Sequence, residues 1–225
     1  MNALWMGTTT GEIADWLPIL WAGLQISLKV TLATLLTGIP LGLVLALLVQ
    51  SKSRVVSWAA LVLVEIGRGT PALVLLQFIY FGLPQIDLSL SSFVSAWVAL
   101  SLTTAAYTSE ILRAGLQAVP AGQIEAAHAL NLSRLDELRF VILPQAVRIA
   151  VPALLGFAIL VFQSTSLCFT IALPEIVSQA NEIGSMTFKY FTVLTITGVI
   201  FALICIPASV FVGWLEHRAA RSSNR

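Results

Sequence analysis

Residues 120–144 read PAGQIEAAHALNLSRLDELRFVILP, a polar, helix-forming stretch in a chain that is otherwise strongly apolar. Ile124, Ala127 and Leu130 recur at helical spacing, which predicts a short helix with one apolar face. We expect this helix to end near Asn131, because Asn tolerates the left-handed backbone conformation that closes many helices. The polar stretch therefore begins as a helix followed by a sharp turn.

A second helix is predicted directly after this turn. Ser133 is followed three residues later by Asp136, a capping-box spacing at which the two residues can cap the first turn of a helix. Pro144 is expected to end this helix, since proline has no N–H to donate to the preceding turn. The apolar stripe of the second helix consists of Leu135, Leu138 and Ile142. We call residues 120–144 the polar hairpin and interpret it as a cytoplasmic docking loop; the alternative is an amphipathic hairpin lying on the membrane.

The composition of the whole chain is that of an integral membrane protein. Of its 225 residues 58% are hydrophobic and 10% charged, with a mean hydropathy of +0.93, which lies outside the usual balance of soluble domains. Five apolar stretches are each long enough to cross roughly 30 Å of hydrocarbon. They cover about residues 19–49, 58–83, 93–118, 145–170 and 191–215. The sequence therefore predicts one all-α transmembrane domain over residues 1–225, with the polar hairpin between its third and fourth transmembrane helices.

The distribution of basic residues predicts the orientation of these five helices, because Lys and Arg concentrate in cytoplasmic loops. Nine of the 12 Lys and Arg residues fall on one side: Lys52, Arg54, Arg113, Arg134, Arg139, Arg148, Arg218, Arg221 and Arg225. The N-terminal residues and the loops near Asp87, Glu175 and Glu182 carry mostly acidic residues and fall on the other side. We expect the N-terminus outside the cell, and the polar hairpin and the C-terminus inside.

Polar side chains within the apolar stretches are candidates for a transport pathway, since a charge in hydrocarbon normally faces a bundle interior or a wet cavity. In the second stretch Glu65 and Arg68 are spaced for an ion pair, and Pro71 is expected to break the helix. Broken helices at membrane depth are tolerated where they line a cavity, which makes Arg68 and Thr70 pathway candidates. A kinked packing helix with an internally neutralised pair is an equally good interpretation.

The third and fourth stretches supply the other pathway candidates. Glu110 lies three residues before Arg113, and its position near the cytoplasmic end suits either a substrate contact or a gate. Four consecutive polar residues, QSTS at 163–166, sweep most of the circumference of a helix, so at least one of them should line a polar cavity. From this segment the candidates are Gln163, Ser164 and Thr165.

The polar hairpin resembles the EAA loop of bacterial ABC-importer permeases. The resemblance rests on Glu125-Ala126-Ala127, a turn residue at 131 and the run Ile142-Leu143-Pro144. It implies docking on an ATP-hydrolysing subunit through Gln123, Glu125, Ala126, Ala127 and Asn131. The family usually has Gly where this chain has Asn131, and a residue that tolerates the left-handed conformation preserves the turn.

Further motifs resemble the polar amino-acid branch of these permeases. They are Arg68-Gly69-Thr70-Pro71, Ala106-Tyr107 with Glu110, Gly122-Gln123 and Thr165-Ser166-Leu167. The resemblance implies a permease in the bacterial inner membrane that imports polar amino acids, as a dimer of five-span subunits with two ATP-binding subunits and an external solute-binding protein. The branch usually has Lys-Asp where this chain has Gln163-Ser164, from which we infer a second, non-identical permease that supplies the missing charge.

No catalytic or metal-binding motif stands out in the sequence. None of the three lysines follows a glycine, so the chain has no Gly-Lys-Ser/Thr phosphate loop, and ATP and Mg²⁺ are expected on the partner ATPase. The two histidines, His128 and His217, lie far apart, and both are expected to be solvated. We therefore expect no enzyme activity, no cofactor and no metal in this chain, and no nucleic-acid partner.

Two other classes of function remain open. A secondary transporter or channel that acts alone usually has more spans, often as inverted repeats, and needs no docking hairpin. A membrane enzyme or structural subunit is the other class, but the acidic residues lie on both sides of the membrane and form no catalytic constellation. The sequence favours a partner-dependent importer and leaves open which amino acid it carries.

Overall fold

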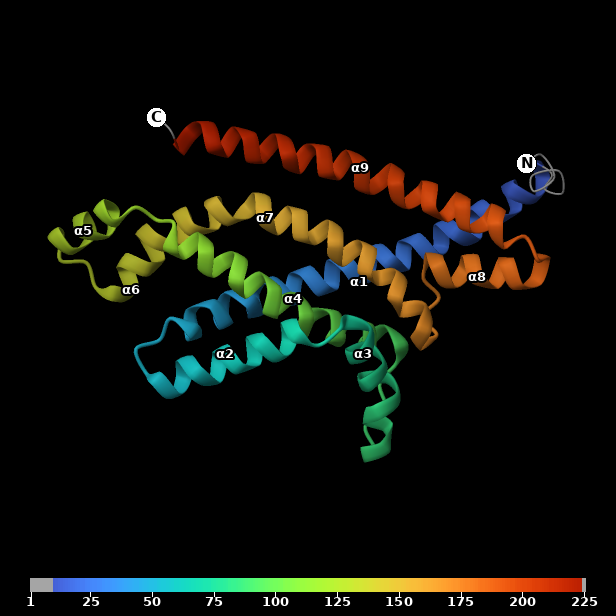
Figure 1. The fold of residues 1–225 in the computed structure, drawn as a ribbon, viewed down its shortest axis with the longest axis horizontal. Coiled ribbons are helices and arrows are strands. Elements are labelled where there is room, and N and C mark those ends of the chain that lie inside the picture. The colour runs from blue at the N-terminus through green and yellow to red at the C-terminus, as the bar shows by residue number, and fades with distance from the viewer. Residues whose placement is uncertain (1–9, 224–225) are drawn as a thin grey trace. The chain divides into compact units, whose positions relative to one another are not determined.

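The computed structural model describes residues 10–223, and all its elements are helical (Figure 1). The α-helices are α1 (Thr10–Val49), α2 (Arg54–Gly69), α3 (Ala72–Gln77), α4 (Ser92–Gln117), α5 (Ala121–Ala129), α6 (Arg134–Asp136), α7 (Leu143–Ser164), α8 (Ile176–Thr187) and α9 (Tyr190–Ser223). Four π or 3-10 turns lie between them: η1 (Phe78–Gly82), η2 (Leu83–Ile86), η3 (Glu137–Ile142) and η4 (Thr165–Ile171). The described part of the chain contains no strand, and the all-α prediction is confirmed.

The described residues form two compact units. The first unit comprises residues 10–36, 70–101 and 159–209, and the second unit comprises residues 37–69, 102–158 and 210–223. The long helices α1, α4, α7 and α9 each contribute one part to either unit. Each unit has its own apolar core, and we describe each by itself.

Among the described residues, three helical stretches are long and apolar enough to cross a membrane: Gly11–Val49, Arg134–Ile171 and Tyr190–Glu216. A fourth is obtained if Arg54–Gly69 and Ala72–Ile86 are counted as one broken span. These stretches confirm an all-helical multi-pass membrane protein. The predicted third span corresponds to α4, a 26-residue helix. Its mean hydropathy is lower than that of these stretches because it carries polar side chains such as Thr104, Thr108 and Glu110.

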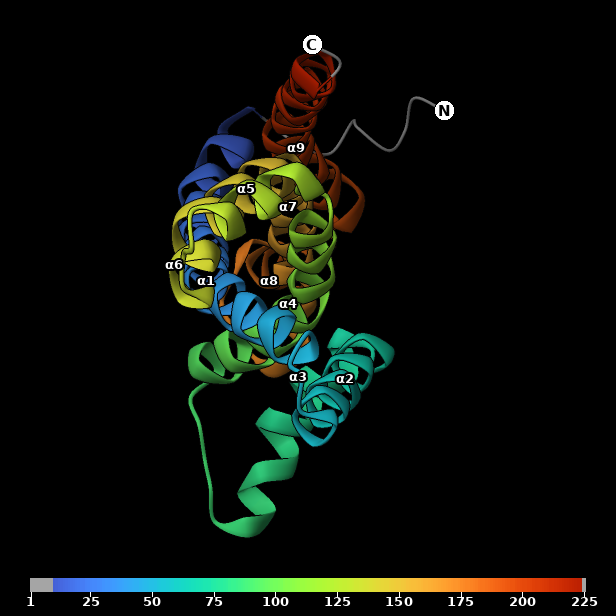
Figure 2. The ribbon, with the colours of Figure 1, turned by 90° about the vertical axis from the view of Figure 1, so that its left-hand side faces the viewer.

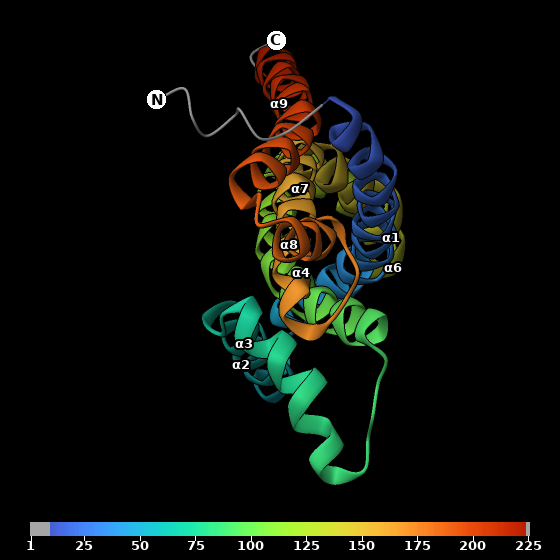
Figure 3. The same cartoon turned by 90° about the vertical axis from the view of Figure 1, so that its right-hand side faces the viewer.

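The core of the first unit contains two clusters of buried apolar side chains. One packs α8 against the first half of α1 and the first half of α9, and includes Leu20, Ile176, Ala180 and Val193. Figure 3 shows α8 following the end of α7 and leading into α9. At Gly23 an added Cβ would lie 2.8 Å from the Cα atom of Ile176, so glycine is what lets α1 meet the start of α8. The other cluster joins α1, α3, α4 and η4 and includes Val30, Leu76, Leu100 and Ile171.

In the second unit the polar hairpin lies where α4 ends and α7 begins (Figures 1 and 2). The apolar core next to it joins α1, α4 and α7, and includes Ala46, Leu112, Leu116, Ala146 and Ala150. Gly115 on α4 faces α7 so closely that an added Cβ would lie 2.7 Å from the carbonyl oxygen of Ala146. Close packing of α4 on α7 thus fixes the two points from which the polar hairpin extends.

The predicted helix break at Pro71 is confirmed. α2 ends at Gly69, α3 begins at Ala72, and Pro71 has extended angles, with φ −58° and ψ 132°. The carbonyl of Pro71 accepts a hydrogen bond from the N–H of Leu75 at 3.1 Å. The proline therefore opens a new helix and does not continue α2.

The predicted end of the second hairpin helix at Pro144 is wrong. The helix continues from α6 through the π turn η3 into α7, so the span expected at 145–170 begins inside the polar hairpin. A π turn bonds residues five apart, which shifts the carbonyl that a proline would otherwise meet four residues earlier. The wider turn accommodates Pro144 within a continuous helix.

Candidate functional site

A tight turn closes α5, the first helix of the polar hairpin. Asn131 has a left-handed backbone, with φ 52°. Its N–H donates to the carbonyl oxygen of His128 at 2.9 Å, and the N–H of Leu132 donates to the carbonyl oxygen of Ala127 at 3.2 Å. These two bonds make a Schellman motif with Asn131 at its left-handed position. The predicted turn conformation at Asn131 is confirmed.

Ser133 caps the helix that follows the turn. Its Oγ accepts a hydrogen bond from the N–H of Asp136 at 3.2 Å and donates to Oδ2 of Asp136 at 2.6 Å. The predicted cap is therefore confirmed. Backbone bonds on one side of the turn and this side-chain cap on the other fix the direction in which α6 (Arg134–Asp136) leaves the turn that ends α5.

The side chains that the EAA resemblance assigns to docking divide between two faces of α5. Gln123, Glu125 and Ala126 are exposed, and so is Asn131 in the turn. Ala127 is only 2% exposed and faces the interior of the second unit. Its side chain is therefore closed to a partner, and its small size serves packing within this chain.

Two leucines predicted to lie on the inner faces of the polar hairpin are exposed. Leu130 is 74% exposed and Leu135 is 70% exposed. Leu130 lies beyond the last residue of α5, so the helical spacing that begins at Ile124 no longer applies to it. Leu135 precedes η3, whose wider turn changes its register relative to Leu138 and Ile142. Helical spacing predicts burial only where the helix is regular.

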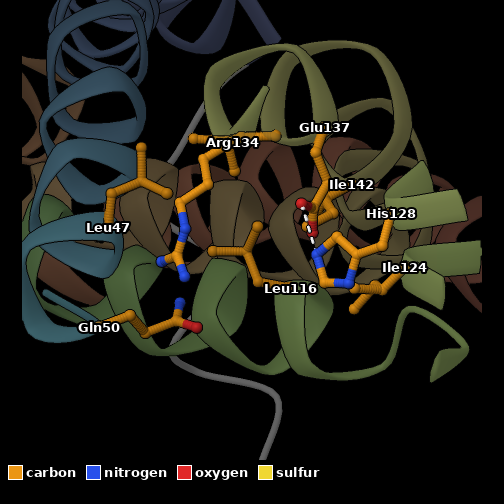
Figure 4. A pocket seen from close by; sticks show the side chains of 9 residues that line it. Leu47, Gln50, Leu116, Ile124, His128, Arg134, Glu137 and Ile142 are labelled. Carbon is orange, nitrogen blue, oxygen red and sulfur yellow. Dashed lines mark hydrogen bonds and ion pairs between the residues drawn. The ribbon is translucent and has the colours of Figure 1, made fainter. Parts of the chain in front are cut away.

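A cavity of about 520 Å³ lies between α5 and the neighbouring helices of the second unit (Figure 4). Its lining combines five apolar with four polar side chains: Leu47, Leu116, Ile124, Leu138, Ile142, Gln50, His128, Arg134 and Glu137. In Figure 4 the guanidinium of Arg134 points toward the amide of Gln50. Part of the inner face of α5 therefore borders open space.

His128 and Glu137 meet at the edge of this cavity. Nε2 of His128 lies 3.0 Å from Oε2 of Glu137, and Glu137 is 8% exposed (Figure 4). The contact is an ion pair when the imidazole is protonated and a hydrogen bond when it is neutral. Sequence analysis misses it: His128 is expected to be solvated, and Glu137 carries no prediction. The one available signal is an imidazole and a carboxylate on either side of the predicted turn.

Glu110 and Arg113 form the predicted pair on α4 in the second unit. Nη2 of Arg113 donates to Oε2 of Glu110 at 2.6 Å, and Nε donates to Oε1 at 3.0 Å. Both side chains are half-buried. Because this two-bond contact neutralises Glu110 within its own helix, Glu110 is a weaker candidate for binding a substrate cation.

Arg68 lies near the end of α2 and contacts Tyr107 of α4. The Tyr107 hydroxyl donates to the Arg68 carbonyl oxygen at 3.3 Å, and the guanidinium carbon lies 6.0 Å from the centre of the Tyr107 ring. The predicted pair with Glu65 is present at 3.4 Å, but the Glu65 side chain is 62% exposed, so the pair contributes little. Nε of Arg68 is buried and has no hydrogen-bond partner among the described residues. Arg68 thus has one donor that no described residue satisfies.

The other pathway candidates belong to the first unit: Thr70, Gln163, Ser164 and Thr165. Ser164 donates to the carbonyl of Leu160 and Thr165 to that of Phe162, each at 2.7 Å, so both hydroxyls are used within their own helical segment. Gln163 lines a cavity of about 310 Å³ together with Ser166, Val177, Leu194, Thr197, Gly198 and Phe201. The QSTS segment therefore lines a cavity, but one whose other walls are mostly apolar.

Within residues 10–223, no three His, Cys, Asp or Glu side chains gather to hold a metal ion. The side chain of His217 lies outside the described part of the chain, as do Arg221 and Arg225, which entered the prediction of orientation. The side chain of His128 is 63% exposed, and its one recorded contact is Glu137. The chemistry that the described residues offer is thus ion pairing and hydrogen bonding.

Known proteins match nearly the whole chain. The family model of the binding-protein-dependent transport system inner membrane component matches residues 38–221. The chain is 36% identical over 217 residues to the glutamate/aspartate import permease protein GltK of Escherichia coli O157:H7, covering 93% of this chain and 97% of GltK. It is 34% identical over 209 residues to the arginine transport system permease protein ArtQ of Bacillus subtilis (strain 168), covering 92% of this chain and 95% of ArtQ.

Solved structures agree with these matches. A crystal structure of an amino acid ABC transporter with histidines is similar with a TM-score of 0.86 and 32% identity, covering 95% of this chain and 100% of that one. An inward-facing structure of the MetNI methionine ABC transporter has a TM-score of 0.69 at 20% identity and supports the fold alone. The chain therefore belongs to the inner membrane components of binding-protein-dependent transport systems, as a multi-pass permease subunit of the amino-acid ABC importers.

Proposed function

We propose that this chain carries a polar amino acid into the cytoplasm, along a path formed with a second permease subunit, while a partner ATPase docks on the polar hairpin. Members of this family work with ATPase and binding-protein partners in general. The observation that carries the docking proposal is α5, a short helix closed by the Schellman turn at Asn131 that presents Gln123, Glu125 and Ala126 to the outside. Such a helix offers a rigid, narrow surface to a cleft on the ATPase.

The proposed membrane topology has five spans within one permease domain, residues 1–225. Its third span is α4, whose 26 residues at about 1.5 Å each exceed the roughly 30 Å of a hydrocarbon core. The N-terminus then lies outside the cell, and the polar hairpin and the C-terminus lie inside. The basic residues on both sides of α5, among them Arg113, Arg134 and Arg139, support this orientation.

The docking face consists of the exposed side chains Gln123, Glu125 and Ala126, together with Asn131 in the turn. Ala126 has the small side chain that lets another protein's backbone come close to α5. Ala127 contributes from the opposite face, where its small side chain lets α5 lie against the second unit. A bulky residue at 127 would therefore act on this chain's own core before it met the ATPase.

The proposed pathway residues are Arg68 and Glu110 in the second unit and Thr70, Gln163, Ser164 and Thr165 in the first. The relatives are named for substrates of opposite charge, glutamate and aspartate for GltK and arginine for ArtQ. A contact that serves every amino acid must therefore recognise a group that all of them share, either the α-carboxylate or the α-ammonium group, and an arginine can bind only the α-carboxylate. Arg68 suits this role because its buried Nε is unsatisfied among the described residues, whereas the Glu110 carboxylate is held by Arg113 and suits a gate.

The proposed complex holds two permease subunits, two ATP-binding subunits and one external solute-binding protein. Each permease has one polar hairpin, and each hairpin docks one ATPase. The complex therefore holds as many ATP-binding subunits as permease subunits. We place a non-identical permease opposite this chain, because Gln163 and Ser164 are uncharged where the branch usually has Lys and Asp. ATP and Mg²⁺ bind to the ATPase, since this chain has no phosphate loop.

Proteoliposomes that hold this chain with the second permease, the ATPase and the solute-binding protein test the proposal. Uptake of labelled amino acids is measured with ATP on the hairpin side and binding protein on the other side. We expect uptake against a gradient that needs ATP and all protein components, for at least one polar amino acid. Uptake that persists without the ATPase would instead identify a secondary transporter, and purification of an active complex with one permease species would refute the non-identical pair.

A further inference from the structure

The joint between the polar hairpin and the membrane is the π turn η3, and Pro144 follows as the second residue of α7. A π turn interrupts the regular ladder of backbone hydrogen bonds, and a proline removes one donor from it. A displacement of α5 could therefore bend this joint and leave α7 where it is. A displacement of α5 therefore reaches α7 only if it first moves η3 with little loss.

The cavity on the inner face of α5 adds a second place where a displacement could be lost. About 520 Å³ of space separates part of α5 from Leu47 of α1, from Gln50 directly after α1 and from Leu116 of α4. Interiors transmit movement because they are close-packed, and a cavity removes that resistance. The residues that hold α5 in place are therefore few, and Ala127 is the one member of α5 that is buried.

His128 and Glu137 form a contact that joins α5 to the first residue of η3 at the edge of the cavity. His128 lies in the last turn of α5, where a positive charge is favourable at the C-terminal end of a helix. Glu137 is the first residue of η3 and is 8% exposed. Since a carboxylate only accepts, Nε2 of His128 is the donor across the 3.0 Å between them. In Figure 4 the two side chains point toward each other across the edge of the cavity.

We infer that His128 and Glu137 are positioning residues that make α5 and the start of η3 move together, so that a displacement of α5 by the docked ATPase is passed on to the helix that leads into the membrane. We call this contact the His128–Glu137 clamp. The inference rests on the proposed docking of the ATPase on α5. Without the clamp, the ATPase still docks and hydrolyses ATP, but the cavity absorbs part of the displacement of α5 before it reaches η3.

The test compares variants in the reconstituted complex by the number of amino acids transported per ATP hydrolysed. His128→Ala removes the donor, whereas His128→Lys keeps a donor that can reach the carboxylate. Arg139→Gln is the matched control, because Arg139 is an exposed charge on the same π turn and stacks on Phe140. Glu137→Leu removes the acceptor while keeping a side chain of similar size in the buried position.

In His128→Ala and Glu137→Leu we expect normal assembly and near-normal ATP hydrolysis, with transport per ATP lowered about threefold or more. His128→Lys and Arg139→Gln should keep the native ratio. A native ratio in His128→Ala, or equal loss in His128→Ala and His128→Lys, would overturn the clamp. Loss of assembly in His128→Ala would also overturn it, because the pair would then have a structural role. If the proposed docking itself were wrong, the result would be different: substitutions on the exposed face of α5 would leave assembly with the ATPase intact.

Discussion

Lys189 holds Glu12 through both carboxylate oxygens, each 2.7 Å from Nζ, although 177 residues separate the two in the chain. Glu12 lies in the first turn of α1, and Lys189 directly precedes α9, so the pair ties two helix ends of the first unit together. The side chain of Lys189 is 25% exposed and that of Glu12 is 39% exposed, so water screens the two charges only in part.

Replacing either partner of this pair should lower the stability of the first unit slightly. We expect Glu12→Gln and Lys189→Gln each to cost about 0.5–1 kcal/mol, and the double variant to cost less than the sum of both. Thermal unfolding of the four proteins in detergent measures this coupling. Strictly additive losses would show that the two side chains do not interact.

The left-handed turn at Asn131 predicts a clear order of two substitutions. Asn131→Gly should be neutral within a few tenths of a kcal/mol, because glycine adopts φ 52° without strain. Asn131→Val should cost about 1–2 kcal/mol, since a β-branched side chain is strained in this conformation. Uptake and thermal stability of the complex should both rank glycine above valine. Equal values for the two variants would mean that the turn does not constrain α5.

Glu175 caps α8 from a fully buried position between the membrane-spanning stretches that end at Ile171 and begin at Tyr190. Its carboxylate accepts from the N–H groups of Val177 at 2.9 Å and Ser178 at 2.7 Å. Burial raises the pKa of Glu175 from 4.5 to about 7, outweighing these hydrogen bonds, which lower it. Between these two values the folded protein holds a proton that the unfolded chain has released, so stability falls as pH rises.

The matching experiment compares the native chain with Glu175→Gln, which keeps the shape but cannot ionise. The melting temperature of the native chain should fall between pH 5 and pH 8 by more than that of the variant, since the stabilising proton is fully bound below pH 4.5 and lost through about pH 7. Parallel pH profiles for the two proteins would mean that Glu175 takes no part in this dependence.

Because we propose that Arg68 binds the substrate carboxylate, Arg68→Gln should raise the substrate concentration needed for half-maximal uptake by about tenfold or more. Glu65→Gln is the control, because Glu65 is exposed and contacts Arg68 at 3.4 Å. It should leave uptake nearly unchanged. Equal losses in both variants would assign Arg68 to ion pairing within α2 and remove it from the pathway.

The parts of the hairpin that sequence predicts correctly are those fixed by neighbours in the chain. A left-handed Asn131 and a Ser133 cap depend on a few consecutive residues, and so does the break at Pro71. Continuation of the helix through Pro144 depends on the π turn before it, and no spacing of residues in the sequence predicts that π turn. Local sequence patterns therefore predict the end of α5 correctly and the start of α7 incorrectly.

Burial and side-chain contacts depend on how the helices pack, and these are the features that sequence misses. Ala127 lies in a motif associated with docking, yet α5 turns it toward the interior of the second unit. His128 reaches Glu137 only because the Schellman turn folds α5 back onto η3. The exposure of Leu130 and Leu135 follows from the same two irregular turns. A local pattern cannot show which face a short helix buries.

The most direct test of the account is whether the exposed face of α5 is the surface on which the ATPase docks. Ala126→Trp places a large side chain on that face, while Ala121→Trp places it at another exposed alanine of α5, about 140° around the helix. Co-purification with the ATPase, quantified for both variants at equal expression, is the measurement. We predict that Ala126→Trp loses the ATPase and that Ala121→Trp retains most of it. Retention of the ATPase with normal stimulated hydrolysis in Ala126→Trp would contradict the docking of the polar hairpin.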